Sequence, residues 1–399
     1  MHPSDDIKGL KSNSLLNKKI IIGITGSISA VEDIKLCREL IRHGAEIIPV
    51  MSKSATKIIH PDSIEFSTGK KPILELTGKT EHVFYCGKGK DKADLLLISP
   101  CTANTISKIS KGIDDNPITT FASTAIGSKI PIIIVPAMHI SMYEHKIIQK
   151  NINDLKENGI KFIEPNIQGN KAKLPDIDEI VSRIIRTIGK NDYRNKKILI
   201  IGGSNSEPID DVRLLTNRSS GKTAINLSKN SYFRGGEVEL WYGNSVEKYP
   251  NFIKTLRFNT LNDIIQLIKS NNIKKYDIII LCAALSDYTI EKKQGKIKSD
   301  KEKLLIELKK SPKIISIIRK KAPNSIIVGF KLCDNKNNVI KEAENLLTNN
   351  KLNFVVGNTI SAINSEKNKI WIIDKNKKNI ELNGNKIDIT NKILDKINK

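Results

Sequence analysis

Short apolar runs, each about the length of one β-strand, recur along this chain between segments of helical periodicity. In the first half these runs cover residues 19–24, 46–50, 94–98 and 131–135. Continuous apolar runs are typical of parallel strands that helices cover on both faces. The segment between the first two runs predicts a helix that Gly44 would end, with an apolar face made of Ile28, Val31, Ile34, Cys37 and Ile41. The pattern therefore predicts βαβ units in an α/β fold.

The pattern restarts in the second half, after a polar stretch at residues 189–196. Further strands are predicted at 198–202, 238–242, 277–282, 326–330, 354–356 and 369–373. Helices are predicted at 221–234, 260–270, 312–321 and 336–349. A chain of 399 residues is too long for one ordinary domain, and domain boundaries fall in polar segments that few contacts cross. We therefore expect two Rossmann-like α/β domains in series, 18–189 and 190–399, after a disordered tail at 1–17.

The cysteines and the hydropathy of the chain indicate the compartment. The five cysteines are widely spaced and form no C-x-x-C pair, which fits neither a disulfide framework nor a structural zinc site. No stretch approaches the roughly 20 consecutive apolar residues of a membrane helix. The first residues lack the apolar core and the cleavage site of a secretory signal. We expect a cytoplasmic protein with no membrane partner and no metal site built from its own residues.

The formal net charge of +23 raises the alternative of a basic protein that associates with nucleic acid. Only ten of the 66 basic residues are arginine, aromatic residues make up 5 %, and the lysines are spread along the whole chain. Surfaces that read or stack nucleic acids favour arginine forks and aromatic platforms. Because no recognition motif accompanies the charge, we expect no nucleic-acid partner, and phosphorylated small molecules fit the charge better.

A glycine- and serine-rich turn, Gly23-Ile-Thr-Gly-Ser-Ile-Ser29, follows the first predicted strand. The backbone N–H groups of such a turn, together with the N-terminus of the next helix, suit a phosphate. The turn lacks the third glycine of the dinucleotide fingerprint, and no acid follows the second strand to bind a ribose. It therefore fits a mononucleotide such as FMN better than NAD, although on its own it fits an ordinary tight turn equally well.

Two further polar segments follow the third and fourth strands, Ser99-Pro-Cys-Thr-Ala-Asn-Thr105 and Pro136-Ala-Met-His-Ile-Ser-Met-Tyr143. With the glycine/serine turn and a histidine before the third strand, these segments resemble the flavin-dependent phosphopantothenoylcysteine decarboxylases. The resemblance covers about residues 18–188 and implies a flavodoxin-like domain that binds FMN. The residues that it places at the cofactor are Gly26, Ser27, Ser29, Ser52, Ser99, Thr102, Asn104 and Met138.

The same resemblance implies two catalytic histidines. His82 matches the family's histidine that handles a proton while FMN oxidises the substrate thiol, before CO₂ leaves. His139 stands where most of the family has an asparagine that holds the substrate carboxylate, to which an imidazole also donates. The flap segment 168–175 lacks the cysteine that many members use to finish the reduction. That departure leaves either Lys171 or Lys173 as a proton donor, or an impaired decarboxylase half.

The second half opens with a long polar string that ends in Gly221-Lys-Thr223. This string is not a P-loop, because residue 216 is threonine where that motif needs glycine. From Gly202 to Lys222 it resembles the opening of phosphopantothenate–cysteine ligase, and shorter motifs follow in the family's order at 282–288, 296–298, 311–314, 328–330 and 356–358. The resemblance covers about residues 197–360 and implies a nucleotide-binding ligase domain.

The ligase family joins phosphopantothenate to cysteine through an acyl-cytidylate made from CTP with Mg²⁺. The resemblance implies that Asn217 holds the acyl intermediate and that Lys296 is needed for turnover. The residues expected at the nucleotide are Ala283, Asp287, Lys296, Pro312, Lys313 and Phe330. A solvated lysine is the alternative for Lys296, which lies in a lysine-rich run. The helix before Val356 lacks basic residues that are common there in the family, which leaves CTP or another nucleotide open.

Together the two resemblances imply a bifunctional ligase and decarboxylase of coenzyme A biosynthesis, which would convert 4′-phosphopantothenate and cysteine to 4′-phosphopantetheine. One alternative is a monofunctional ligase with an impaired decarboxylase half. Another, of a different class, is the basic nucleic-acid-associated protein. Relatives of the first half form trimers and the ligase half dimerises, so a homo-oligomer is expected.

Overall fold

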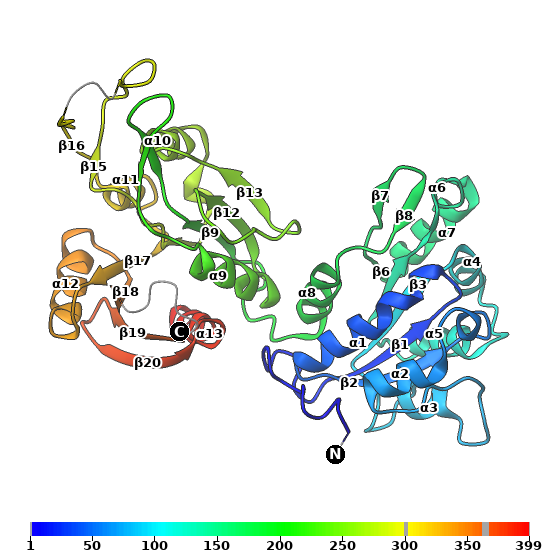
Figure 1. Cartoon of the computed structure of the whole chain (residues 1–399). Helices are drawn as coiled ribbons and strands as arrows, with labels where there is room; N and C mark the ends of the chain where they lie inside the picture. The colour runs from blue at the N-terminus through cyan, green and yellow to red at the C-terminus, as the bar shows by residue number, and fades with distance from the viewer. Residues whose placement is uncertain (1, 299–301, 361–366, 399) are drawn as a thin grey trace. The chain divides into compact units, whose positions relative to one another are not determined.

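A computed structural model describes residues 2–298, 302–360 and 367–398 of the chain. The chain divides into two compact units, Met1–Gly189 and Lys190–Lys399 (Figure 1). Each unit is built on a largely parallel sheet with helices packed against it, so the predicted α/β class is confirmed. No helix within the described ranges is long and apolar enough to cross a membrane.

The sheet of the first unit has the strand order β2-β1-β3-β4-β6, and every pairing in it is parallel. This is the flavodoxin-like order, in which the chain reverses its direction of travel between β1 and β3. Four of these strands were predicted from the apolar runs, and the short edge strand was missed. The strands are β1 (Lys19–Ile24), β2 (Glu46–Met51), β3 (Leu95–Cys101), β4 (Ile132–Pro136) and β6 (Lys161–Phe162).

Helices cover the sheet of the first unit, and a small antiparallel sheet, β5-β8-β7, stands beside the end of β4. The small sheet consists of β5 (Met138–His139), β7 (Asn166–Gln168) and β8 (Lys171–Lys173). The helices are η1 (Ile28–Glu32), α1 (Asp33–Arg42), η2 (Ala55–Lys57), α2 (Pro61–Thr68), α3 (Glu81–Cys86), α4 (Ala103–Lys111), α5 (Pro117–Gly127), α6 (Ile140–Tyr143), α7 (Lys146–Glu157) and α8 (Ile177–Ile188).

The first predicted helix begins later than its apolar spacing indicated. Ile28 and Val31 lie in the 3-10 turn η1 and are 76 % and 44 % exposed, so the prediction that they belong to the buried face was wrong. A 3-10 turn has three residues per turn, which moves these side chains off the face of the helix that follows. The buried face of α1 is made of Asp33, Leu36, Cys37, Leu40 and Ile41.

Residues 2–17 were expected to be a disordered tail, but the structure packs them against the end of α1. Leu15 is fully buried, and its N–H donates to the carbonyl of His43 at 2.8 Å. The N–H groups of Gly9 and Lys11 donate to the carbonyls of Ile41 and Arg42. The last carbonyls of a helix have no partner within it, and these donors satisfy them.

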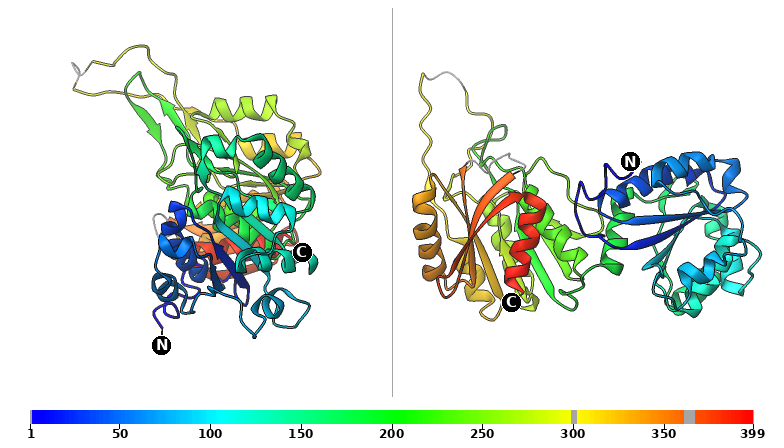
Figure 2. Two further views of the ribbon diagram at one scale, coloured as in Figure 1. Left: turned by 90° about the vertical axis from the view of Figure 1, so that its right-hand side faces the viewer. Right: turned by 90° about the horizontal axis from the view of Figure 1, so that it is seen from below.

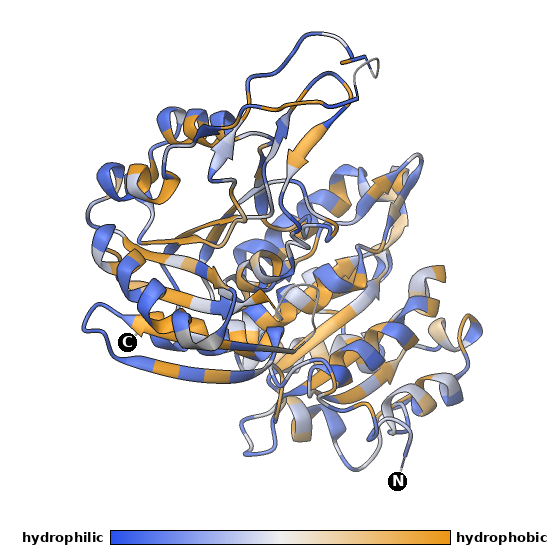
Figure 3. Ribbon diagram, turned by 60° about the vertical axis from the view of Figure 1, so that its left-hand side comes forward, coloured by the Kyte–Doolittle hydropathy of each residue, from blue (hydrophilic) through white to orange (hydrophobic). Residues whose placement is uncertain are grey.

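The second unit contains an eight-stranded sheet in the order β13-β12-β9-β14-β17-β18-β19-β20, antiparallel only at its last two pairings. Its first strand is central, as in Rossmann-like folds, so that the chain reverses direction between β9 and β14. Figure 3 shows hydrophobic stretches along the strands. The strands are β9 (Lys197–Gly202), β12 (Glu237–Tyr242), β13 (Lys254–Arg257), β14 (Ile278–Leu281), β17 (Ile326–Cys333), β18 (Phe354–Thr359), β19 (Lys367–Asp374) and β20 (Asn379–Asn385).

Two short antiparallel pairs, β10–β11 and β15–β16, extend from the second unit as arms (Figure 2). They are β10 (Ser206–Pro208), β11 (Leu214–Thr216), β15 (Tyr288–Thr289) and β16 (Lys309–Lys310). The helices are α9 (Lys222–Phe233), α10 (Leu261–Ser270), η3 (Ile273–Lys275), α11 (Ile314–Lys321), α12 (Lys336–Asn349) and α13 (Lys386–Ile397). The four helices predicted for this half are confirmed, and α13 was missed.

Candidate functional site

In the first unit, the side chain of Thr25 joins the turn after β1 to the end of β3. Its hydroxyl donates to the carbonyl of Pro100 at 2.7 Å and accepts from the N–H of Thr102 at 3.0 Å. This places the glycine/serine turn beside the segment 99–105 at the switch point of the sheet. Open α/β sheets bind their ligands at such a point. Sequence reasoning did not single out Thr25, whose only signal is a polar residue at the end of an apolar strand.

The turn after β1 also packs closely on the end of β2. A Cβ added at Gly26 would lie 2.5 Å from Cβ of Ser54, so only glycine fits there without a shift. The N–H of Ser52 donates to the carbonyl of Ile24 at 3.1 Å. The structure therefore brings Gly26, Ser27, Ser29 and Ser52, all predicted cofactor residues, to one edge of the sheet.

The predicted cofactor residues after β3 and β4 differ in exposure. Thr102 caps α4 by accepting from the N–H of Thr105, Asn104 is exposed, and Met138 is half-buried on β5. Ser99 is fully buried, and its hydroxyl donates to Oδ1 of Asp33 at 3.3 Å. The structure thus gives the Ser99 side chain a partner inside the protein.

Asp33 is a buried acid that sequence reasoning read only as part of a helix. It is the first residue of α1 and is fully buried, and its Oδ2 has no hydrogen-bond partner among the described residues. Burial, partly offset by the hydrogen bond from Ser99, raises the pKa of Asp33 well above its ordinary value. Such an environment favours the protonated acid.

The two predicted catalytic histidines lie on different elements. His82 is half-buried on α3, and its Nδ1 is buried without a hydrogen-bond partner in the described part of the chain. His139 is exposed at the start of α6, where its Nδ1 accepts from the N–H of Ser141 at 3.3 Å. No described hydrogen bond joins His82 to the turns at the strand ends.

The predicted flap is the β7–β8 hairpin, and it pairs directly with the strand of His139. In that pairing His139 is opposite Lys171, and Met138 is opposite Ala172. Lys173 donates instead to the side chain of Gln168 at 2.9 Å. Of the two predicted proton donors, Lys171 therefore occupies the position beside His139.

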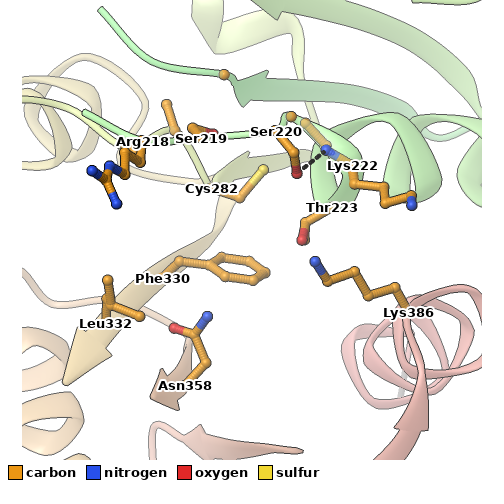
Figure 4. A pocket seen from close by; sticks show the side chains of 15 residues that line it. Arg218, Ser219, Ser220, Lys222, Thr223, Cys282, Phe330, Leu332, Asn358 and Lys386 are labelled. Atoms are coloured by element: carbon orange, nitrogen blue, oxygen red, sulfur yellow. Dashed lines mark hydrogen bonds between the residues drawn. The ribbon is translucent and has the colours of Figure 1, made fainter. Parts of the chain in front are cut away.

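The second unit has a pocket of about 170 Å³ at the switch point between β9 and β14. Ala283 and Phe330, both predicted at the nucleotide, line it. Figure 4 shows Phe330 in this pocket. Gly221, at the start of α9, has φ +77°, and a Cβ there would lie 1.9 Å from the hydroxyl of Tyr242. The other lining residues are Gly203, Arg218, Ser219, Ser220, Lys222, Thr223, Ala224, Cys282, Ala284, Leu332, Asn358 and Lys386.

A second, more open pocket of about 460 Å³ adjoins the first and shares the segment Arg218–Ser220 with it. Asn217, predicted to hold the acyl intermediate, lines this second pocket, and its amide donates to the carbonyl of Ala284 at 3.1 Å. Ala284 in turn donates its N–H to the carbonyl of Gly203. Asn217 therefore stands where the two pockets meet.

Lys296 is exposed and lines neither of these two pockets, but its loop is held from both sides. Oδ2 of Asp210 accepts from the N–H of Ile297 at 3.0 Å, and Oδ2 of Asp211 accepts from the N–H of Gly295 at 2.9 Å. Although desolvation opposes it, the backbone hydrogen bonds, that of Ile297 first, hold the pKa of Asp210 below its usual range. The loop is therefore held by a hydrogen bond on each side of Lys296.

The remaining predicted nucleotide residues form a separate exposed group. Nζ of Lys313 lies 2.5 Å from Oδ1 of Asp287, and the N–H of Ser311, next to Pro312, donates to the carbonyl of Asp287. None of the three predicted residues lines either of the two pockets. The structure thus brings Asp287, Pro312 and Lys313 together. This group lies outside the pocket that Ala283 and Phe330 line.

A buried polar network around Asn205 and Glu207 connects the strand ends of the second unit. The resemblance assigned no role to these two residues. Oε1 of Glu207 accepts from the side chain of Asn205 and from the N–H of Leu261, at 2.7 and 2.8 Å. Oδ1 of Asn205 accepts from the N–H of Ser286, and Oε2 of Glu207 accepts from the hydroxyl of Thr289. The network ties the turn after β9 to the segment that leads to Asp287.

Comparison with known proteins assigns both units. A flavoprotein family model matches residues 9–189, and the model of the DNA/pantothenate metabolism flavoprotein C-terminal domain matches residues 193–399. The chain is 42 % identical to the coenzyme A biosynthesis bifunctional protein CoaBC of Thermococcus kodakarensis, over 94 % of this chain and 93 % of the relative. The chain belongs to the CoaBC family.

Two further CoaBC proteins match over similar lengths. That of Methanocaldococcus jannaschii is 37 % identical over 100 % of this chain and 98 % of the relative. The CoaBC protein of Borreliella burgdorferi is 33 % identical over 90 % of this chain and 93 % of the relative. The chain is therefore a bifunctional enzyme of coenzyme A biosynthesis, with a decarboxylase and a ligase activity, and neither the monofunctional ligase nor the nucleic-acid-associated protein is favoured.

The buried carboxyl of Asp33 predicts how stability depends on pH. The pKa of Asp33 is higher in the folded chain than in the unfolded chain. Its contribution to the free energy of unfolding is therefore fully present below about pH 4 and is lost as the pH rises through the pKa of the folded state. Asp33→Asn removes this loss. The melting temperature of the apo chain, followed by calorimetry from pH 5 to 8, should therefore fall less steeply for the variant than for the wild type.

Asp114→Asn is the matched control, since Asp114 is an exposed acid of the same unit. Its profile should run parallel to that of the wild type. Parallel profiles for Asp33→Asn as well would show that Asp33 is ionised in both the folded and the unfolded chain.

Proposed function

We propose that the second unit, 190–399, joins 4′-phosphopantothenate to cysteine with CTP through an acyl-cytidylate, and that residues 18–189 decarboxylate the product to 4′-phosphopantetheine. The observation that best supports this proposal is that both sheets gather their polar turns at a switch point, next to Thr25 in one unit and Ala284 in the other. Phosphorylated substrates also suit a chain with a net charge of +23.

FMN fits the turns of the first unit. The N–H groups and hydroxyls of the segment Gly26–Ser29, with Ser52, would hold its phosphate, and Thr102, Asn104 and Met138 would lie along the rest of the molecule. The close approach of Gly26 to Ser54 keeps the turn tight at this edge, and the buried Nδ1 of His82, on α3, is a polar atom left without a partner among the described residues. When bound, FMN supplies the two-electron oxidation of the substrate thiol that makes loss of CO₂ feasible.

The chain's own residues handle protons and charge in the decarboxylation. His82 would take or return a proton at an imidazole nitrogen. His139 would donate to the carboxylate of the substrate, and Lys171, opposite it in the β5–β8 pairing, is the nearer candidate to protonate the product. The absence of a flap cysteine then changes the proton donor and does not abolish the activity.

In the ligase half, the pocket with Ala283 and Phe330 would take the nucleotide, which enters with Mg²⁺. The adjoining pocket would take phosphopantothenate, with Asn217 at the junction where the acyl group and the α-phosphate meet. Lys296 would neutralise charge on the transferring phosphoryl group. Asp210 and Asp211 would act as positioning residues for its loop.

A homo-oligomer in the cytoplasm completes the proposal. Val83 and Phe84, next to His82, are each 51 % exposed, and Val212 and Leu305 on the arms of the second unit are 63 % and 90 % exposed. Large apolar side chains that are exposed in this way suit interfaces between subunits. Trimeric decarboxylase units and dimeric ligase units would cover them.

The direct test is to incubate the purified full chain with phosphopantothenate, cysteine and CTP. Mass spectrometry should find 4′-phosphopantetheine, CMP and pyrophosphate, and the protein should be yellow with the absorption spectrum of bound FMN. Accumulation of phosphopantothenoylcysteine by a protein that FMN does not reconstitute would contradict the decarboxylase assignment. ATP in place of CTP, in parallel, tests the nucleotide.

His82→Asn should slow the release of CO₂ from phosphopantothenoylcysteine by at least about 100-fold, because a positioned acid–base group commonly contributes that much to the rate. Ligation should stay unchanged, since the two sites lie in separate units. His145→Asn, at an exposed histidine of the first unit, is the control and should behave as the wild type. Decarboxylation at the wild-type rate by His82→Asn, with FMN bound, would remove His82 from the mechanism.

Lys296→Gln should slow ligation by about 10²–10³ while weakening CTP binding little, because charge on the phosphoryl group builds up in the transition state. Lys303→Gln, an exposed lysine farther along the same arm, is the control and should be nearly silent. The measurement is kcat and KM for CTP in each variant. Equal effects of the two substitutions would mean that the run acts only as diffuse positive charge.

A further inference from the structure

The last helix of the chain, α13, is fixed on α9 by buried polar contacts. The amide of Asn230, which is 3 % exposed, donates to the carbonyl of Ile387 at 3.1 Å and to the hydroxyl of Thr390 at 2.8 Å. At the C-terminal cap of α9, the guanidinium of Arg234 donates to the carbonyl of Asn391 at 3.1 Å. Since α9 begins at the nucleotide pocket, this packing also fixes the first residue of α13 there.

That first residue is Lys386, and its side chain lines the nucleotide pocket. Lys386 is 7 % exposed. Figure 4 shows its side chain running from α13 into the pocket toward Thr223, with Phe330 and Asn358 to one side. The side chain of Lys386 thus lies in the pocket and is almost wholly shielded from solvent.

The stability of α13 does not account for a lysine at this place. The N-terminus of a helix carries a partial positive charge, and a cation in the first turn is unfavourable there. The helix already has a cap, since Asn385 accepts from the N–H of Asp388 at 2.8 Å. A lysine at the first position of α13 opposes the helix dipole and therefore does not stabilise the helix itself.

The pocket around Lys386 has the chemistry of a polyanion site. Arg218 and Lys222 bring two more cations, and Ser219, Ser220 and Thr223 bring hydroxyls. No carboxylate occurs among the lining residues that the structure describes. Lys222 lies 3.8 Å from Glu247, outside this lining, which balances part of its charge. The lining of the pocket thus brings together basic and hydroxyl side chains of the kind that bind phosphates.

We propose that Lys386 binds the polyphosphate chain of the nucleotide and that α13 is thereby a part of the ligase site. This inference rests on the proposed function, and it assigns to the C-terminal helix a contact that the ligase motifs, which end near residue 360, do not contain. It also gives a source of positive charge in place of the basic residues missing from α12. The contact exists before and during the reaction, so it would set nucleotide affinity more than turnover.

The test is Lys386→Met in the full chain, compared with the wild type. We expect KM for CTP to rise about ten-fold or more, because charge-assisted hydrogen bonds are worth that much, while kcat and KM for phosphopantothenate change less than three-fold. Lys386→Arg should stay within about three-fold of the wild type. Lys392→Met, at an exposed position of the same helix, should be silent.

A second readout does not depend on catalysis. Inorganic tripolyphosphate should raise the melting temperature of the wild type, and this shift should be reduced in Lys386→Met but not in Lys392→Met. If Lys386→Met does not fold, as judged by circular dichroism, Lys386→Gln replaces it. An unchanged KM for CTP in an active variant, or an equal tripolyphosphate shift in both proteins, would overturn the inference.

The outcomes for the inference and for the ligase reaction are separable. A wild type that makes no phosphopantothenoylcysteine contradicts the proposed function, whereas the tripolyphosphate shift still decides whether Lys386 binds phosphates. A wild type that ligates normally, with Lys386→Met indistinguishable from it, leaves the function standing and removes Lys386 from the site.

Discussion

A parallel strand cannot return to its neighbour through a tight turn, and this constraint shapes both units of the chain. Each parallel pair needs a crossover, so helices cover the sheets and all carboxyl ends collect at one edge. Where the strand order reverses, between β1 and β3 and between β9 and β14, neighbouring crossovers leave in opposite directions and open a crevice. Apolar runs without polar interruptions satisfy the two buried faces, which leaves the polar residues for the turns.

Turns that form a binding site must also be held in place, and each unit does this with few groups. In the first unit the Thr25 hydroxyl joins two segments, because it donates a hydrogen bond to the carbonyl of Pro100 and accepts one from the N–H of Thr102. In the second unit the carbonyl of Gly203 and the N–H of Ala284 join directly, and the Asn205–Glu207 network supports them. A buried polar group that lacks a partner destabilises the folded state. Such networks therefore favour the one arrangement of the turns in which every group is paired.

The sequence was sufficient where a local pattern determines the structure. The apolar runs located every central strand, and the motif order identified the family. The pattern failed at Ile28 and Val31, since a 3-10 turn changes the period, and at residues 2–17, where the partners are the carbonyls at the end of α1. It also missed β20, which is half-exposed and polar, and with it α13. These elements depend on contacts with distant segments, which no local spacing encodes.

The candidate site divides in the same way. Ala283 and Phe330 were predicted to lie together and do, whereas Asp287 and Lys313 pair with each other outside the pocket. Asp33 was missed because an acid at the start of an amphipathic helix is ordinarily a favourable surface residue. Only tertiary packing shows that this one is buried against Ser99.

The lysines show most clearly what composition leaves undetermined. In a chain with 66 basic residues, position in the sequence does not separate a functional lysine from a solvated one. The structure distinguishes two lysines from the rest, each by a different environment. Lys296 is exposed on a loop that Asp210 and Asp211 hold on either side. Lys386 is buried on a helix that Asn230 joins to α9. An exposed lysine loses little hydration before the reaction begins and is suited to charge that develops later. A buried lysine has already lost most of its water and is suited to charge that is present in the bound nucleotide.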